Sequence, residues 1–208
     1  MKTARTRRRG FSLVEVLVAL AIVSTLMVSV LGALQASFDG YKVANESAAS
    51  HVVARMVTHR VSSMVRTGTD FGPFPANAIR TPVLVPDPPR IEFATGIDAA
   101  TGLTEVVKLE RRAAPTEVID AGGAPFELWY VRSLVGPSGV VGTPLEQPLL
   151  TDVQSLRFTM YYEPGPRLDR LTMDLIIRPP EMEDAAVAAG LDSPSFRFFT
   201  TVSPRRQD

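Results

Sequence analysis

Residues 11–34 read FSLVEVLVALAIVSTLMVSVLGAL. The polar side chains in this stretch are those of Ser12, Glu15, Ser24, Thr25 and Ser29. A helix of about 20 apolar residues crosses a bilayer core, so the stretch is long enough to span a membrane. A helix that is apolar on every side has no face to turn toward water, unlike the surface helices of soluble domains. The sequence therefore predicts a transmembrane helix over residues 11–34.

The segment before this stretch, residues 1–10, is basic. It holds Lys2 and four arginines, and no acidic residue precedes Glu15. Basic residues that flank a membrane span favour the cytoplasmic side. We therefore expect a single-pass protein with a cytoplasmic N-terminus and an extracytoplasmic body.

Two simpler interpretations are a secretory signal peptide and a plain signal anchor. A signal peptide has an apolar region of about 7–15 residues followed by a small-residue cleavage site. The apolar run here is longer, and its best candidate cleavage site is GALQA at residues 32–36. Glu15 argues against both interpretations, because an acidic residue within a span is costly and usually functional. A further alternative is that Glu15 extends to the membrane interface and has no role.

The segment RRRGFSLVE, residues 7–15, resembles the processing site of type IV prepilins and type II secretion pseudopilins. In that family a basic leader ends in Gly, the next residue becomes an N-methylated N-terminus, and the fifth mature residue is Glu. The resemblance implies that a prepilin peptidase cuts between Gly10 and Phe11 and that Phe11 is methylated. It also implies that residues 1–10 are a leader peptide and that Glu15 acts in assembly.

The chemistry of such a cut is consistent with this role for Glu15. Cleavage would leave an ammonium group on Phe11, about one helical turn from Glu15. A carboxylate in an apolar medium needs a cationic partner, and the resemblance implies that a neighbouring subunit's amine supplies it. The implied partners are prepilin peptidase, other pilin or pseudopilin subunits and the inner membrane, with a secreted substrate as a further candidate. Close helix approach would be favoured by small residues, namely Ala19, Ser24, Ser29 and Gly32.

Residues 35–66 are predicted to continue the helix with one buried face. The helix is expected to end at Thr67-Gly68. The apolar positions assigned to the buried face are Ala49, Val52, Val53, Met56, Val57, Val61, Met64 and Val65.

Residues 67–89 are rich in proline and are expected to form an irregular loop that wraps the helix and covers a sheet edge. Residues 90–208 are expected to form a β-rich extracytoplasmic domain. Alternating patterns predict strands at 90–93, 105–109, 126–131, 156–162, 171–177 and 196–202. Turn signals stand at 122–123, 136–139, 165–166 and 179–180, and a short helix is expected at 181–189. The fold class is α+β: a pilin-like long N-terminal helix packed on an antiparallel sheet.

Composition narrows the chemistry. The chain has 22 basic and 22 acidic residues, so nothing draws it as a whole to nucleic acid, and nucleic acid is an unlikely partner. It has no cysteine, which excludes thiolate nucleophiles and thiolate metal sites.

His51 and His59 would lie about 12 Å apart along a helix, too far to share a metal ion. Trp129 and Tyr161 are expected to pack rather than to bind ligand, and four aspartates are expected in turns: Asp98, Asp120, Asp152 and Asp169. We therefore predict no enzyme activity, cofactor or metal site.

Weaker features of the later chain, such as Leu150–Val153 and the C-terminal segment Thr201–Arg205, resemble the larger minor pseudopilins of the J type. This resemblance implies a minor structural subunit of a type II secretion or type IV pilus-like filament. Two other classes remain open. One is a minor pilin that acts as an adhesion or DNA-uptake module, and the other is a membrane-anchored extracytoplasmic enzyme.

Overall fold

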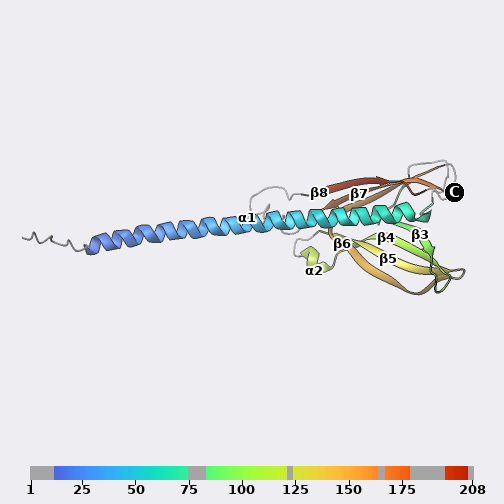
Figure 1. Cartoon of the computed structure of the whole chain (residues 1–208), viewed down its shortest axis with the longest axis horizontal. Coiled ribbons are helices and arrows are strands. Elements are labelled where there is room, and N and C mark those ends of the chain that lie inside the picture. The colour runs from blue at the N-terminus through green and yellow to red at the C-terminus, as the bar shows by residue number, and fades with distance from the viewer. Residues whose placement is uncertain (1–11, 75–82, 121–123, 164–166, 179–194, 206–208) are drawn as a thin grey trace, which may run out of the picture. The chain divides into compact units, whose positions relative to one another are not determined.

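The computed structural model describes residues 12–74, 83–120, 124–163, 167–178 and 195–205. The chain divides into two compact units, Met1–Asn45 and Glu46–Asp208. A long helix, α1 (Leu13–Thr67), provides most of the first unit and contributes to the second. An antiparallel sheet follows it (Figure 1), which confirms the predicted α+β fold with a long N-terminal helix.

The helix ends where it was predicted to end. Gly68 follows the last helical residue, and its amide donates to the carbonyl of Met64 at 2.9 Å. A Cβ at Gly68 would lie 2.6 Å from the ring of Phe93 and 3.0 Å from that of Phe71. A glycine stands there because the helix end packs directly against aromatic rings of the sheet.

The second half of α1 buries one narrow stripe. Its buried apolar residues are Ala54, Val57, Val61 and Val65. The i, i+3, i+4 spacing of these positions places them on one side of a helix.

The predicted buried face was therefore too wide. Val57, Val61 and Val65 are buried as expected, and Met64 is partly buried. Other members of the predicted set are exposed, namely Ala49, Val52, Val53 and Met56. The apolar pattern covered two adjacent stripes of the helix, and the sheet covers only one of them.

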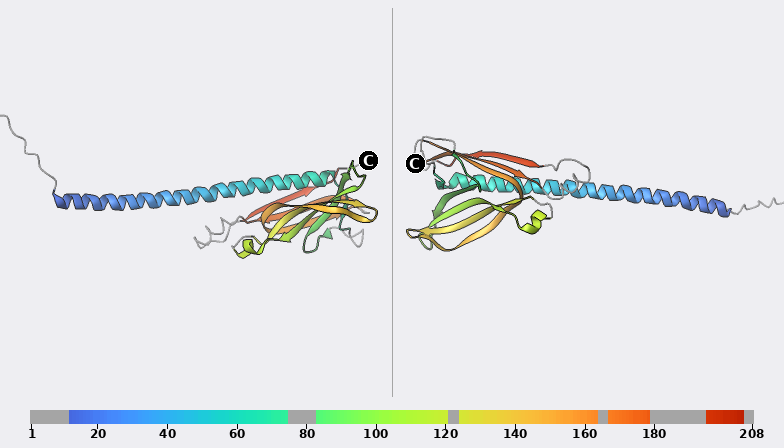
Figure 2. Two further views of the ribbon diagram at one scale, coloured as in Figure 1. Left: turned by 90° about the horizontal axis from the view of Figure 1, so that it is seen from below. Right: turned by 180° about the vertical axis from the view of Figure 1, so that it is seen from behind.

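Among the described residues the sheet has eight strands, and all of them pair antiparallel. In chain order, the elements after α1 are β1 (Thr69–Gly72), β2 (Val83–Leu84), β3 (Arg90–Ile97), β4 (Thr104–Ala113), α2 (Thr116–Asp120), β5 (Phe126–Gly136), β6 (Gly139–Tyr162), β7 (Leu168–Ile177) and β8 (Phe196–Val202). The spatial order is β1-β3-β4-β5-β6-β7-β8, with β2 also paired to β6. Figures 1 and 2 show the sheet curving around the second half of α1, with β7 and β8 along one side of it.

The six predicted strands are all present, and most are longer than predicted. The largest difference is β6, which begins at Gly139 instead of residue 156. The turn predicted at 136–139 is the β5–β6 hairpin, where Gly136 pairs with Gly139, a glycine of positive φ (110°). The first half of β6 was missed because Pro144 and Pro148 interrupt its alternation.

The expectation of a wholly irregular segment at 67–89 was wrong. It contains β1, which pairs with β3 at the edge of the sheet, and β2, which pairs with β6. The prolines flank these short strands, and they do not interrupt them. The predicted helix at 181–189 and the turns predicted at 122–123, 165–166 and 179–180 lie outside the described residues.

The core joins the helix stripe to the inner face of the sheet. Its largest fully buried side chains include Phe93 on β3 and Phe158 on β6. On β6 and β7 the buried positions alternate as a strand requires: Leu156, Phe158 and Met160 face inward opposite Leu175, Met173 and Leu171.

Candidate membrane-anchoring and assembly site

Two side-chain hydrogen bonds cap the first turn of α1. The amide of Val14 donates to Oγ of Ser12 at 3.2 Å, and the amide of Ser12 donates to Oε2 of Glu15 at 3.1 Å. This arrangement is a variant of the capping box, in which the Glu15 side chain satisfies the amide of Ser12 while the Ser12 hydroxyl satisfies the amide of Val14. The Ser-x-x-Glu spacing of residues 12–15 is the sequence signal of such a cap, and it was not among the predicted features.

Glu15 thus has a local role at the start of the helix. Its carboxylate turns back toward residue 12, which is the end at which a processed chain would carry its amine. A negative charge here also lies at the positive end of the helix dipole. Gly10 and Phe11 lie outside the described residues, so the predicted cleavage and methylation sites remain predictions.

The first unit exposes almost all of its apolar surface. From Leu13 to Leu34 the large apolar side chains are 50–77% exposed. An exposed apolar surface of this extent marks a site that meets lipid or another protein. In length and composition, α1 qualifies as a helix that can cross a membrane.

The hydroxyl groups in this stretch are compatible with lipid, because each donates a hydrogen bond within the helix. Ser24 donates to the carbonyl of Leu20 at 2.7 Å, and Thr25 donates to that of Ile22 at 2.9 Å. Ser29 donates to the carbonyl of Thr25 at 3.1 Å. A buried hydroxyl without a partner would be costly in the bilayer. Glu15 is consequently the residue of the span whose charge needs a partner from elsewhere.

The histidines do not form a site. His51 packs its ring against Phe196 and Phe198, with centroids 5.7 and 5.2 Å away, and His59 is exposed. Among the described residues there is no group of three or more His, Cys, Asp or Glu side chains arranged to hold a metal ion.

Of the four aspartates that were expected in turns, only Asp98 lies in one. Asp120 is the last residue of α2, and Asp152 and Asp169 lie within strands. Asp152 has a positive φ of 59° at a register shift of β6, so it marks a distortion of the strand.

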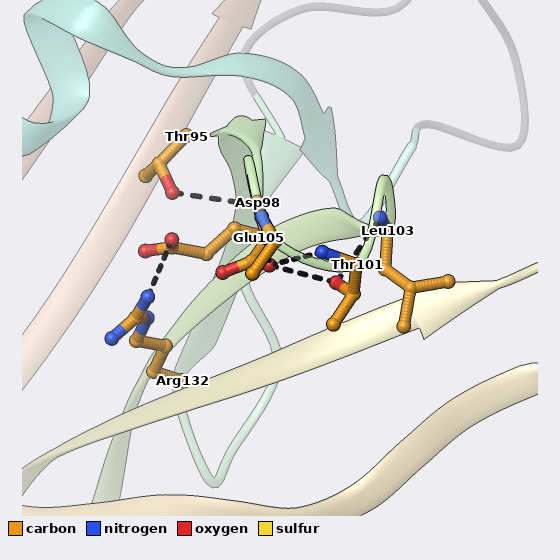
Figure 3. Close-up of polar contacts among 7 residues, drawn as sticks. Thr95, Asp98, Thr101, Leu103, Glu105 and Arg132 are labelled. Atoms are coloured by element: carbon orange, nitrogen blue, oxygen red, sulfur yellow. Dashed lines mark hydrogen bonds and ion pairs between the residues drawn. The ribbon is translucent and has the colours of Figure 1, made fainter.

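Figure 3 shows the turn that contains Asp98. Oδ1 of Asp98 accepts from the amides of Ala100 and Thr101 at 3.1 and 2.8 Å, and from the hydroxyl of Thr101 at 2.8 Å. These hydrogen bonds, led by that of the Thr101 hydroxyl, lower the pKa of Asp98. Nearby, Arg132 pairs with Glu105 at 2.8 Å. The polar groups here satisfy one another, which is the pattern of a structural turn.

Trp129 and Tyr161 both pack against arginine side chains of the same chain. Arg112 lies 4.6 Å from the ring centre of Trp129, whose indole donates to Glu127 at 2.7 Å. Arg170 lies 4.2 Å from the ring centre of Tyr161. These contacts agree with the expected packing role.

The prokaryotic N-terminal methylation motif matches residues 5–31. No curated protein and no solved structure matches the chain. The motif supports the type IV pilin and pseudopilin family, and with the apolar helix it supports membrane anchoring. It implies processing by prepilin peptidase and assembly with other pilin subunits, and it points to a structural subunit of a class that is usually not enzymatic.

Proposed function

We propose that this chain is a minor, pseudopilin-like structural subunit of a type II secretion or type IV pilus-like filament, similar to the larger J-type subunits. The observation that supports this most is the coincidence, within residues 5–31, of the methylation motif with an apolar helix whose first turn holds Glu15. The motif supports the type IV pilin and pseudopilin family. The exposed apolar surface of the helix favours its association with lipid or with other helices.

In this proposal prepilin peptidase cuts between Gly10 and Phe11, and Phe11 is methylated. The basic segment 1–10 stays on the cytoplasmic side of the inner membrane until it is removed. The second unit, Glu46–Asp208, is extracytoplasmic and contacts neighbouring subunits, a secreted substrate or both.

Glu15 changes partners during assembly. In the single chain its carboxylate accepts a hydrogen bond from the amide of Ser12. In the filament it accepts a hydrogen bond from the charged amine of a neighbouring subunit's Phe11. This interaction is stronger than the one with the amide, because both groups are ionised and the surroundings are apolar. The charge pair sets the axial register between neighbouring helices in the filament.

The test is co-expression with prepilin peptidase and partner subunits, followed by cross-linking between helices in the membrane. Glu15→Ala should still be processed and should lose most of the cross-linked product. Ser12→Ala is the matched control, because it removes the capping hydroxyl and leaves the Glu15 carboxylate in place. Cross-linking of Glu15→Ala at the native level would refute the role of Glu15.

A further inference from the structure

A cavity of about 640 Å³ lies in the second unit, next to the end of α1. Its lining comes from β1, from Glu163 and Arg167 with the start of β7, and from Ser203–Arg205 after β8. Three segments that are distant in the sequence therefore meet at one place.

The walls of the cavity are held by hydrogen bonds. The hydroxyl of Tyr162 donates to the carbonyls of Phe71 and Pro73 at 3.2 and 3.1 Å, which fixes β1 against β6. The amide of Arg205 donates to the carbonyl of Arg66 at 2.8 Å, which fixes the segment after β8 to the end of α1. The cavity is consequently a preformed feature of the fold.

Four charged side chains that line the cavity have no partner in the part of the chain that the structure describes. Asp70, Arg167, Asp169 and Arg205 form no ion pair and no side-chain hydrogen bond within the described part of the chain. On the outer surface of the sheet, by contrast, Arg112 binds Glu110 and Glu146 at 2.6 and 2.7 Å.

The cavity also has an apolar part. Leu168 is buried in its wall, and Phe74 is 56% exposed at the cavity. Asp70 adopts a positive φ of 51°, a conformation that costs a residue other than glycine some energy. Two carboxylates and two guanidinium groups without partners among the described residues, together with the carboxylate of Glu163, thus surround an apolar surface.

We propose that this cavity binds a short peptide segment of a partner protein, in which an apolar side chain is flanked by one basic and one acidic residue. A ligand of a single charge would leave one pair of side chains unmatched, whereas such a peptide matches both signs and the apolar surface. The volume lies within the range of about 300–1,000 Å³ that is usual for ligand pockets. The peptide specifies the chemistry of the partner that the second unit is proposed to contact. In this respect the proposal rests on the proposed function.

The test uses the full-length, unprocessed chain in detergent and a set of fluorescent hexapeptides. The peptides carry Phe, Leu or Ser between Lys and Asp, in both orders of charge. We expect the Phe or Leu peptides of at least one order to bind at least tenfold more tightly than the Ser peptides. Phe74→Ala should weaken this binding about tenfold, and Asp70→Lys should weaken it further by removing the partner of the peptide's lysine.

Phe199→Ala is the matched control, because Phe199 is an exposed aromatic residue outside the cavity. It should leave binding unchanged, and thermal unfolding should show that Phe74→Ala is folded. Equal binding of the Phe and Ser peptides, no binding of any peptide, or unchanged binding by Phe74→Ala would overturn the proposal. Because the chain is unprocessed, such a failure is distinct from a failure of cleavage or filament assembly.

Discussion

The two halves of α1 place the same residue types in opposite surroundings. Val23, in the first unit, is 58% exposed, and Val61, in the second unit, is 1% exposed. The first half is apolar on all sides, and the second half has two adjacent apolar stripes, one of which the sheet covers. The second unit buries a hydrophobic core of its own, whereas the apolar surface of the first unit is exposed and is of the kind that meets lipid or another protein.

The largest expected effect comes from breaking the apolar character of the first half. Two lysines, Val23→Lys with Met27→Lys, would each cost about 2.5–3.5 kcal/mol near the centre of a span, or roughly 5–7 kcal/mol together. We expect the doubly substituted chain to leave the membrane fraction after alkaline extraction.

The matched control for this change is Val52→Lys with Met56→Lys, at exposed positions in the second half of the helix. This variant should remain in the membrane fraction and keep its stability, because both side chains already face away from the core. Extraction of the control together with the first variant would contradict the assigned difference between the halves.

A smaller effect is expected in the core of the second unit. Phe93→Ala removes a fully buried ring that packs against Phe71, and we expect it to lower the free energy of unfolding by about 3–5 kcal/mol. Denaturant unfolding of the full chain in detergent measures this change in the free energy of unfolding. Phe199→Ala, at an exposed ring, should change stability by no more than about 0.5 kcal/mol. Similar losses for both variants would show that Phe93 is not a core residue.

The end of α1 offers a third test. Gly68→Ala forces a methyl group against the rings of Phe93 and Phe71, and we expect it to destabilise the second unit by about 1–3 kcal/mol. Gly40→Ala is the control, because a Cβ at Gly40 meets nothing within 4 Å. Thermal unfolding should separate the two, and an unchanged melting temperature for Gly68→Ala would argue against the close packing.

The smallest effect concerns alkaline pH. Burial raises the pKa of Tyr162 to about 12, so the folded chain keeps the phenol proton at a pH where the unfolded chain, with a pKa near 10, loses it. Stability from this group is full below pH of about 10 and falls as pH rises toward 12. Tyr162→Phe should make the decline of stability over this interval shallower, and an identical pH dependence in the two proteins would contradict the assignment.

The sequence predicted what depends on local pattern. The helix, its end at Gly68, the six strands and the hairpin at 136–139 were all visible as periodicity or turn residues. The capping box of Ser12 and Glu15 was also visible and was missed. The width of the buried helix face could not be predicted, because it depends on how much of the helix the sheet reaches.

The cavity was beyond sequence reasoning for a related reason. Asp70, Arg167 and Arg205 come from segments far apart in the chain, and no local pattern shows that they line one cavity. The long strand β6 was likewise hidden, because its prolines read as a loop until its pairing with β5 is known.

The central claim, that the first unit is a processed assembly helix, is tested most directly by the intact mass of the protein isolated from membranes. The measurement compares cells with and without active prepilin peptidase. The account predicts that the peptidase removes residues 1–10 and that the new N-terminal residue, Phe11, carries one methyl group. An uncut chain in the presence of active peptidase, or a cut near Ala36, would contradict it.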